Sequence, residues 1–331
     1  MPKAVKFVKV MKFGGSSVGS AERIQNVAKI VLGARKSGGV AVVVSAMQGI
    51  TDKLLALDFD FVKEKHLAVA KELKVAAPTE LLTELESVIK GIKLLGDASP
   101  MALDLVVSFG ERLSANLVAS YLNKKTPSIA VDSRELIKTD SNFQNAAVDF
   151  VATNRNIKKF FSKLVVSRKS LVVPVVTGFI SSNAAGKTTT LGRGGSDYSG
   201  AILGAALGVD VIEIWTDADG VMTADPRIVK AAFTLPEISY EEAFEMAYFG
   251  AKVIHPATMV PAIKKGIPVL IKNTFNPKHS GTVISRESSV VSGSSFVKNI
   301  SAIDGISLVT VGGTELAGVP GTAERVFHAA A

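Results

Sequence analysis

A short segment near the start of the chain combines a cation with small residues. Lys12 is followed after one residue by Gly14, Gly15 and Ser16, and an apolar run precedes it. Glycines at a strand end let backbone N–H groups approach an anion, and the start of a following helix adds partial positive charge. A lysine ammonium supplies a point charge to a phosphoryl group. The segment predicts phosphate binding, although a plain turn is the alternative for two glycines at a strand end.

A second glycine-rich segment, residues 188–197, has the sequence TTTLGRGGSD. Gly194, Gly195 and Ser196 lie between a cation, Arg193, and a carboxylate, Asp197. Such a loop can form a nest of backbone N–H groups that binds an anion. The alternative is a flexible surface connection, which the flanking charges disfavour.

Neither segment fits the two common nucleotide fingerprints. A P-loop ending at Gly186-Lys187-Thr188 needs a glycine where Ser181 stands. A dinucleotide-binding pattern starting at Gly14 needs a glycine where Ser16 stands. The expected chemistry is phosphate handling without either fingerprint.

Apolar runs alternate with helix-period stretches around these segments, which predicts an α/β layer fold. The run 40–45 is typical of a strand buried on both faces. Pro174 predicts an edge position or a bulge for the strand that contains it. We expect strands at 5–13, 40–45, 105–108, 171–180 and 211–216, helices from 20 and over 52–95, 111–124 and 196–207, and a loop over 185–195.

Composition narrows the class of protein. Apolar residues make up 47% of the 331 residues and charged residues 21%, an ordinary globular balance. The net charge of +8 comes from scattered residues without interleaved aromatics, so nucleic acid is not the expected partner. No run is apolar enough to span a membrane or serve as a signal peptide, and we expect a cytoplasmic enzyme. The chain has no cysteine and its four histidines lack metal-ligand spacing, so no protein-held metal is expected.

Six segments, taken together and in order, resemble the aspartate kinases of the amino acid kinase family. The resemblance covers residues 12–285, and its segments are KFGGSSV (12–18), VSAMQGIT (44–51), SFGERLSA (108–115), TTTLGRGGSDYSGA (188–201), WTDADGVMTADPR (215–227) and FGAKVIHPAT (249–258). The GRGGSD segment is found across the family, whereas KFGGSSV and SFGERLSA point to aspartate kinases. The resemblance implies a three-layer αβα sandwich with a mainly parallel sheet and ligands above the strand C-termini.

The resemblance also implies the reaction and its participants. The enzyme would transfer the γ-phosphoryl group of ATP to the side-chain carboxylate of L-aspartate, giving 4-phospho-L-aspartate, the first step toward lysine, threonine and methionine. That carboxylate is ionised at neutral pH, with a pKa of about 3.9, so no general base is needed. Catalysis would consist of positioning and charge neutralisation, with Mg²⁺ held mainly by the ATP phosphates.

Roles transfer to this chain residue by residue. Lys12 is expected to contact the transferring phosphoryl group and Asp197 to orient Lys12. Glu111 is expected to bind the substrate ammonium, and Arg193 its α-carboxylate. Ser45, Thr51 and Ser196 complete the predicted substrate site, and the predicted ATP site comprises Lys12, Gly14, Gly15, Ser16, Gly194, Gly195, Thr216, Asp217, Met222, Arg227 and Lys252.

Met222 departs from the family pattern, which commonly has tyrosine there. A thioether packs against a base but donates no hydrogen bond, so nucleotide preference stays open.

The domain prediction has three parts. Residues 1–285 form the kinase domain, 286–295 a polar linker, and 296–331 a partial segment resembling an ACT regulatory module. Its exposed strand edges favour pairing with another chain, and we expect a homo-oligomer, a dimer or larger. The allosteric effector, the oligomer size and the reason for the short module stay open.

Two alternatives remain at this point. The acceptor could be that of another amino acid kinase relative, such as glutamate, acetylglutamate, carbamate or a nucleoside monophosphate. The chain could also be a non-catalytic regulatory subunit, which the joint presence of Lys12, Glu111, Arg193 and Asp197 disfavours.

Overall fold

A computed structural model describes residues 7–96, 98–166, 172–248, 256–286, 297–302, 305, 310 and 321–330. The chain divides into two compact units, Met1–Ser301 and Ala302–Ala331. Among the described helices, none is long and apolar enough to cross a membrane.

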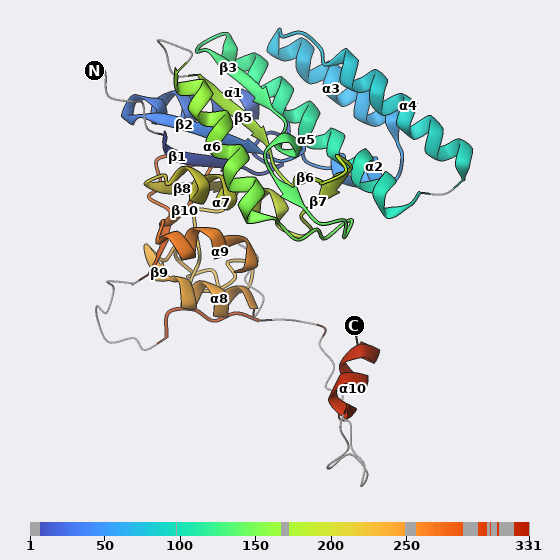
Figure 1. The fold of residues 1–331 in the computed structure, drawn as a ribbon. Helices are drawn as coiled ribbons and strands as arrows, with labels where there is room; N and C mark the ends of the chain where they lie inside the picture. The colour runs from blue at the N-terminus through green and yellow to red at the C-terminus, as the bar shows by residue number, and fades with distance from the viewer. Residues whose placement is uncertain are drawn as a thin grey trace. The chain divides into compact units, whose positions relative to one another are not determined.

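The first unit contains an eight-stranded sheet in the order β3-β5-β2-β1-β8-β10-β11-β9 (Figure 1). All neighbouring strands are parallel except β10 and β11. Their bounds are β1 Phe7–Phe13, β2 Gly39–Val44, β3 Ser128–Val131, β5 Val173–Thr177, β8 Val211–Thr216, β9 Glu237–Ser239, β10 Val269–Asn273 and β11 Thr282–Ser285.

Two apolar clusters cover the two faces of this sheet. Val42 and Val44 of β2 belong to one cluster, whereas Ala41 and Val43 belong to the other. The period of two along a strand sends alternate side chains to opposite faces, so β2 is buried throughout, as predicted. The fold is therefore a three-layer αβα sandwich, and the expectation is confirmed.

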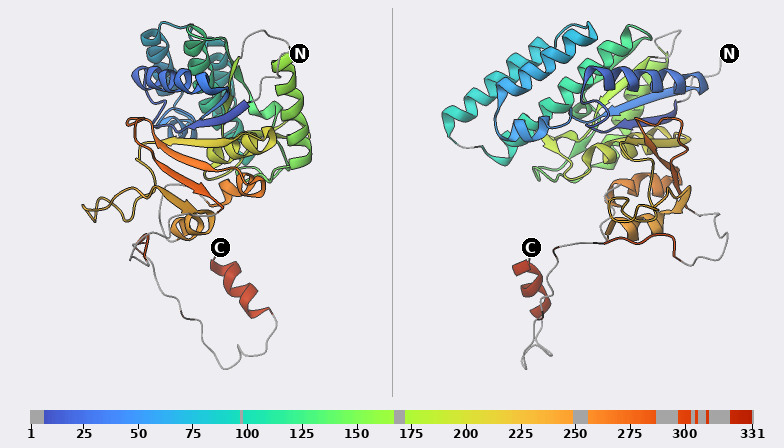
Figure 2. Two further views of the ribbon diagram at one scale, coloured as in Figure 1. Left: turned by 90° about the vertical axis from the view of Figure 1, so that its left-hand side faces the viewer. Right: turned by 180° about the vertical axis from the view of Figure 1, so that it is seen from behind.

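Helices complete the two outer layers (Figure 2). The first cluster includes side chains from α1 Ala21–Ala34, α2 Ile50–Leu55, α3 Phe59–Leu73, α4 Thr79–Leu95 and α5 Pro100–Asn123. The second includes side chains from α6 Phe150–Val166, α7 Gly195–Leu207, α8 Tyr240–Tyr248 and α9 Pro256–Lys265.

The first unit also contains a small second sheet of three strands. Its order is β4 (Lys138–Thr139), β6 (Ile180–Asn183) and β7 (Thr188–Thr190), with β6 and β7 antiparallel. Short 3₁₀ turns occur at η1 (Arg35–Ser37) and η2 (Ser133–Glu135). The loop expected over 185–195 is therefore wrong in part, because its threonine run forms β7.

The strand predicted at 105–108 is also wrong, because these residues lie inside α5. Ser99 caps this helix by accepting a hydrogen bond from the Ala102 N–H, and Pro100 occupies the first turn, where its missing N–H costs nothing. The helix is buried on most of its circumference, and a helix surrounded by protein loses the apolar period of 3.6. A buried helix segment and a buried strand then have the same local pattern.

Pro174 does not lie on an edge strand, since β5 pairs with both β3 and β2. The Val173 N–H donates to Pro127 O, toward the β3 side, so the neighbouring Pro174 nitrogen faces β2. Pairing with β2 begins only at Val42 and Val175. The missing donor falls just before this ladder, which is why an interior strand tolerates the proline.

Within the second unit, the structure describes one helix, α10 (Thr322–Ala330). Nearly all of the predicted linker 286–295 and half of the ACT-like segment 296–331 lie outside the described residues. Both therefore stay predictions.

Candidate active site

A pocket of about 600 Å³ opens at the carboxyl ends of β1 and β2. The strand ends are joined by hydrogen bonds from the Ser45 N–H to Phe13 O and from the Gly178 N–H to Val44 O. The predicted site residues that line the pocket are Lys12, Gly15, Ser45, Thr51, Glu111, Arg193, Gly194, Gly195, Ser196 and Asp197. Segments nearly 190 residues apart in sequence thus meet in one cavity.

Lys12 and Asp197 form an ion pair within this pocket, with Nζ and Oδ1 2.6 Å apart. Their side chains are 11% and 15% exposed. Lys12 lies in β1, between Val43 of β2 and Ile214 of β8, and Asp197 lies in the first turn of α7. The rigid sheet and the helix therefore fix the direction of the lysine ammonium.

Helix α7 approaches the sheet closely at two glycines. A Cβ on Gly200 would lie 3.3 Å from Cβ of Lys12. A Cβ on Gly204 would lie 2.5 Å from Cγ1 of Ile212 in β8, which is closer than real carbon contacts. These approaches bring the start of α7 to the strand ends.

The start of α7 is suited to an anion. Gly194 occupies the N-cap with a φ of 73°, a left-handed conformation that favours glycine, and provides no capping side chain. First-turn N–H groups lack partners within a helix and carry partial positive charge. Gly15 is required for a different reason, because a Cβ there would lie 2.8 Å from Ala46 O, which is too close for a carbon atom. Residues of both glycine-rich loops therefore line the pocket.

Glu111 is a buried carboxyl group on the pocket wall formed by α5. Its Oε1 accepts a hydrogen bond of 3.1 Å from the Ala46 N–H, whereas its Oε2 has no partner among the described residues. Burial raises the pKa of Glu111 to about 8. An unsatisfied buried carboxyl oxygen has a high affinity for a donor such as an ammonium group.

Arg193 is exposed at the rim of the pocket. Within the part of the chain that the structure describes, its guanidinium takes part in no ion pair. The planar donor fork is therefore available to a carboxylate.

Of the predicted nucleotide residues, Lys12, Gly15, Gly194 and Gly195 line this pocket. The other described ones do not line it: Gly14, Ser16, Thr216, Asp217, Met222 and Arg227. Thr216 ends β8 beside Gly14, whose N–H donates to Trp215 O. Farther along, Met222 Sδ accepts a hydrogen bond of 3.4 Å from Thr234 Oγ1. Arg227 is exposed and paired with Asp225. Asp217 hydrogen-bonds with Thr216, Ser16 O accepts from Arg23, and Lys252 lies outside the described residues.

Asp104, Gln144 and Phe179 are among the pocket residues that the sequence analysis did not predict. Gln144 and Phe179 have positive φ angles of 71° and 65°, which are strained for residues with a Cβ. Asp104 stands seven positions before Glu111, so the two share a helix face. That spacing was the available signal, and the mistaken strand at 105–108 hid it.

Comparison with known proteins shows the family of this chain. The model of the amino acid kinase family matches residues 8–273. A chloroplastic bifunctional aspartokinase/homoserine dehydrogenase 2 of Zea mays is 39% identical over 97% of this chain and 37% of its own length. Aspartokinase 1 of Arabidopsis thaliana, also chloroplastic, is 37% identical over 96% of this chain and 58% of its own length.

A solved structure gives the same result. E. coli aspartokinase III, crystallised in complex with aspartate and ADP, superposes with a TM-score of 0.76 at 34% identity, covering 86% of this chain and 65% of that one. The chain spans little more than a third of the length of the bifunctional relatives it matches. Its fold, its two glycine-rich loops and the extent of the family match agree: the chain belongs to the amino acid kinase family.

Proposed function

We propose that this protein is an aspartate kinase that transfers the γ-phosphoryl group of ATP to the side-chain carboxylate of L-aspartate. One observation carries the proposal. A single pocket contains an oriented lysine, an available arginine and a buried glutamate with an unsatisfied oxygen. These groups match the phosphoryl group, the α-carboxylate and the ammonium of the substrates. The relatives named aspartokinases, and the E. coli enzyme with aspartate and ADP, support the same acceptor.

The acceptor half of the reaction follows from the pocket chemistry. Glu111 receives the α-ammonium and Arg193 the α-carboxylate, while Ser45 and Thr51 offer hydroxyls on the same wall. The side-chain carboxylate then faces Lys12. Because this carboxylate is already ionised, with an ordinary pKa of about 3.9, it attacks the γ-phosphorus without a general base. The bond from the γ-phosphorus to the bridging oxygen breaks, and ADP leaves with the electron pair.

Charge neutralisation is the main catalytic requirement. Two anions must approach each other, and preorganised cations and N–H donors lower the barrier to that approach. Lys12, held by Asp197, lies at the phosphoryl position, and Gly194, Gly195 and Ser196 present the start of α7.

We place Mg²⁺ with the nucleotide. The described residues contain no group of three or more acidic or histidine side chains that could hold a metal. We expect the ATP phosphates to carry the ion, where it would neutralise their charge. Gly14, Gly15, Ser16, Thr216, Asp217, Met222, Arg227 and Lys252 remain the predicted nucleotide contacts.

The test is a hydroxylamine trap for the acyl phosphate product. Purified protein with ATP and Mg²⁺ is expected to give the hydroxamate with aspartate and little with glutamate, and Lys12→Met is expected to abolish the signal. ATP binding without hydroxamate formation from aspartate would refute the proposal and favour the regulatory alternative. Phosphorylation of a nucleoside monophosphate would favour the other family alternative.

The remaining parts of the proposal concern the whole protein. Residues 1–285 would form the kinase domain, followed by a linker over 286–295 and a partial ACT-like segment over 296–331. Homo-oligomer formation and a cytoplasmic location remain predictions, and the plant relatives are named as chloroplastic. Size-exclusion chromatography with light scattering would measure the oligomer.

A further inference from the structure

The three threonines of β7 are all held by side-chain hydrogen bonds to other elements. Thr189 Oγ1 lies 2.7 Å from Thr139 Oγ1 and 2.9 Å from Ser181 Oγ. Thr188 Oγ1 accepts from NH1 of Arg134 at 3.0 Å, and Thr190 Oγ1 donates to Oδ1 of Asp104 at 2.9 Å. All three threonines are buried. These hydrogen bonds hold the strand that leads into Arg193.

The hydrogen bond from Thr190 connects β7 to a buried carboxylate, Asp104 of α5. Asp104 is 1% exposed, and its Oδ2 accepts from the N–H groups of Thr190 at 3.0 Å and Gln144 at 2.9 Å. Among the described residues, no cation pairs with this carboxylate. A buried carboxylate without a counter-ion is costly, and its three hydrogen bonds are what stabilise it here. Burial correspondingly raises the pKa of Asp104.

The two segments that Asp104 binds also interlock with each other next to Arg193. The Ala146 N–H donates to Thr190 O at 2.9 Å. A Cβ on Gly192, where φ is 72°, would lie 2.6 Å from Oδ1 of Asn145. Gln144 itself has a strained left-handed backbone. Asp104 therefore holds a strained loop and the end of β7 together immediately before Arg193.

Helix α5 carries both Asp104 and Glu111, and Glu111 is part of the pocket described above, which we call the acceptor pocket. Asp104 and Glu111 both line the pocket and are separated by seven residues, about 10 Å along a helix. Glu111 thus faces one end of the substrate from the same rigid element that holds the Arg193 segment.

We propose that Asp104 is a positioning residue that sets the distance between Arg193 and Glu111, and thereby the fit of the amino acid substrate. This inference rests on the proposed function, because it assigns the two ends of the substrate to those residues.

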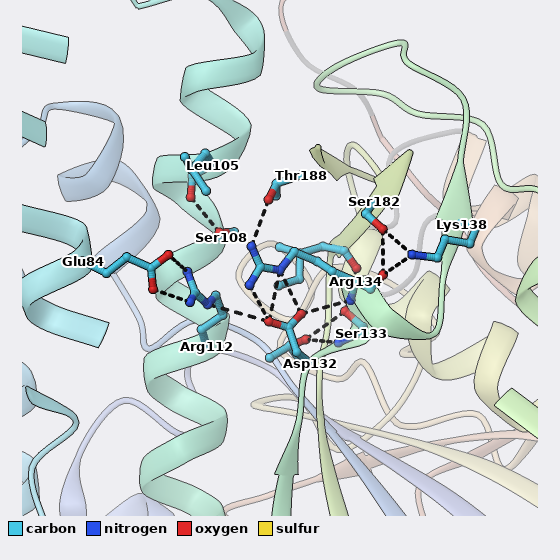
Figure 3. Close-up of polar contacts among 12 residues, drawn as sticks. Glu84, Leu105, Ser108, Arg112, Asp132, Ser133, Arg134, Lys138, Ser182 and Thr188 are labelled. Carbon is cyan, nitrogen blue, oxygen red and sulfur yellow. Dashed lines mark hydrogen bonds and ion pairs between the residues drawn. The ribbon is translucent and has the colours of Figure 1, made fainter. Parts of the chain in front are cut away.

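A second attachment, at the other end of β7, provides the matched control (Figure 3). Glu84 of α4 pairs with Arg112 of α5, and Asp132 lies between Arg112 and Arg134. Arg134 then reaches Thr188. Thr188 and Thr190 are the same residue type, in the same strand, on the same face, but only Thr190 bonds to Asp104.

The experiment compares Thr190→Val, Asp104→Asn and Thr188→Val. We expect Thr190→Val and Asp104→Asn to raise the KM for aspartate about tenfold, the effect of losing one hydrogen bond to a charged group. The kcat and the KM for ATP should stay within about twofold, as should all parameters of Thr188→Val. Equal changes in Thr188→Val and Thr190→Val would overturn the proposal, because both would then act through general loss of β7 structure.

Two further measurements separate positioning from other causes. In an Arg193→Ala background, adding Asp104→Asn should change the KM for aspartate no further, since the residue that Asp104 positions is already gone. Full additivity of the two substitutions would contradict the inference.

Hydrogen exchange of the amides of residues 190–197 gives a readout that needs no activity. Exchange should rise in Thr190→Val and not in Thr188→Val. If the unmodified protein fails to phosphorylate aspartate, the proposed function fails, while the exchange contrast still supports or refutes the positioning role of Asp104.

Discussion

The acceptor side and the nucleotide side of the predicted site differ in how their side chains are supported. On the acceptor side, Lys12, Glu111 and Asp197 are at least partly buried and are held by strands and long helices. On the nucleotide side, Met222 and Arg227 lie in a long connection between β8 and β9, and Arg227 is bound to Asp225. Preorganised groups lose little entropy when a ligand binds, whereas loop groups must be ordered by it. We infer that the acceptor pocket exists before substrate arrives and that nucleotide binding rearranges the loop.

The strongest test of the preorganised side is Lys12→Met. Loss of one oriented donor at the reacting group should lower kcat about 10²-fold or more. Steady-state kinetics with saturating substrates would measure it. Lys9→Met is the matched control, because Lys9 lies in the same strand but pairs with Glu213, outside the acceptor pocket. A kcat for Lys12→Met close to that of the control would remove Lys12 from the mechanism.

Arg193→Ala tests the rim of the same pocket. The KM for aspartate should rise about 30-fold, the equivalent of about 2 kcal/mol for a charge-assisted hydrogen bond. The KM for ATP should stay nearly unchanged, and kinetics with each substrate varied in turn would separate the two. Arg155→Ala, on α6, serves as a control for loss of a positive charge. A change confined to ATP would reassign Arg193 to the nucleotide.

The raised pKa of Glu111 predicts a pH dependence of aspartate binding. Binding an ammonium requires the carboxylate form, and with a pKa of about 8 the ionised fraction rises about fivefold between pH 7 and pH 8. The KM for aspartate should therefore fall about fivefold over that interval. Glu111→Gln should bind weakly at both pH values and lose this dependence; retention of the dependence would exclude Glu111 as its source.

The same group predicts how stability changes with pH. Between the ordinary value of 4.5 and about 8, the folded protein retains a proton that the unfolded chain releases. Stability contributed by Glu111 therefore falls as the pH rises through this window. Thermal denaturation at pH 5 and pH 8 should show a smaller loss in Glu111→Gln than in the unmodified protein.

The smallest expected effect concerns the nucleotide side. If Arg227 must leave Asp225 to reach the phosphates, Asp225→Asn should lower the KM for ATP about threefold, in keeping with the weak coupling of exposed ion pairs. Initial rates at varied ATP would measure this. An unchanged or higher KM would mean that the pair with Asp225 already holds Arg227 in its working position.

Much of the fold and of the acceptor site could be predicted from local sequence, and the exceptions have physical causes. The strands at 40–45 and 211–216 are short apolar runs bounded by polar residues, and tertiary contacts agree with that pattern. Helix α5 was misjudged around Leu105 because burial on most sides removes its period. Asp104 was missed because the mistaken strand at 105–108 hid its spacing from Glu111. Gln144 was missed because a hydrogen bond across 40 residues leaves no local signal.

The glycines of α7 have a consequence for how this site can change. Gly200 and Gly204 are four residues apart and therefore lie on one side of the helix, where each touches the sheet. Alanine at either position would strengthen an isolated helix by about 1 kcal/mol, yet its methyl group would act as a wedge. The wedge would lift α7 and draw Asp197 away from Lys12. The two glycines thus lower the intrinsic stability of α7 but allow Asp197 to reach Lys12. Glycine-to-alanine substitutions, which stabilise most helices, should therefore lower activity at these two positions.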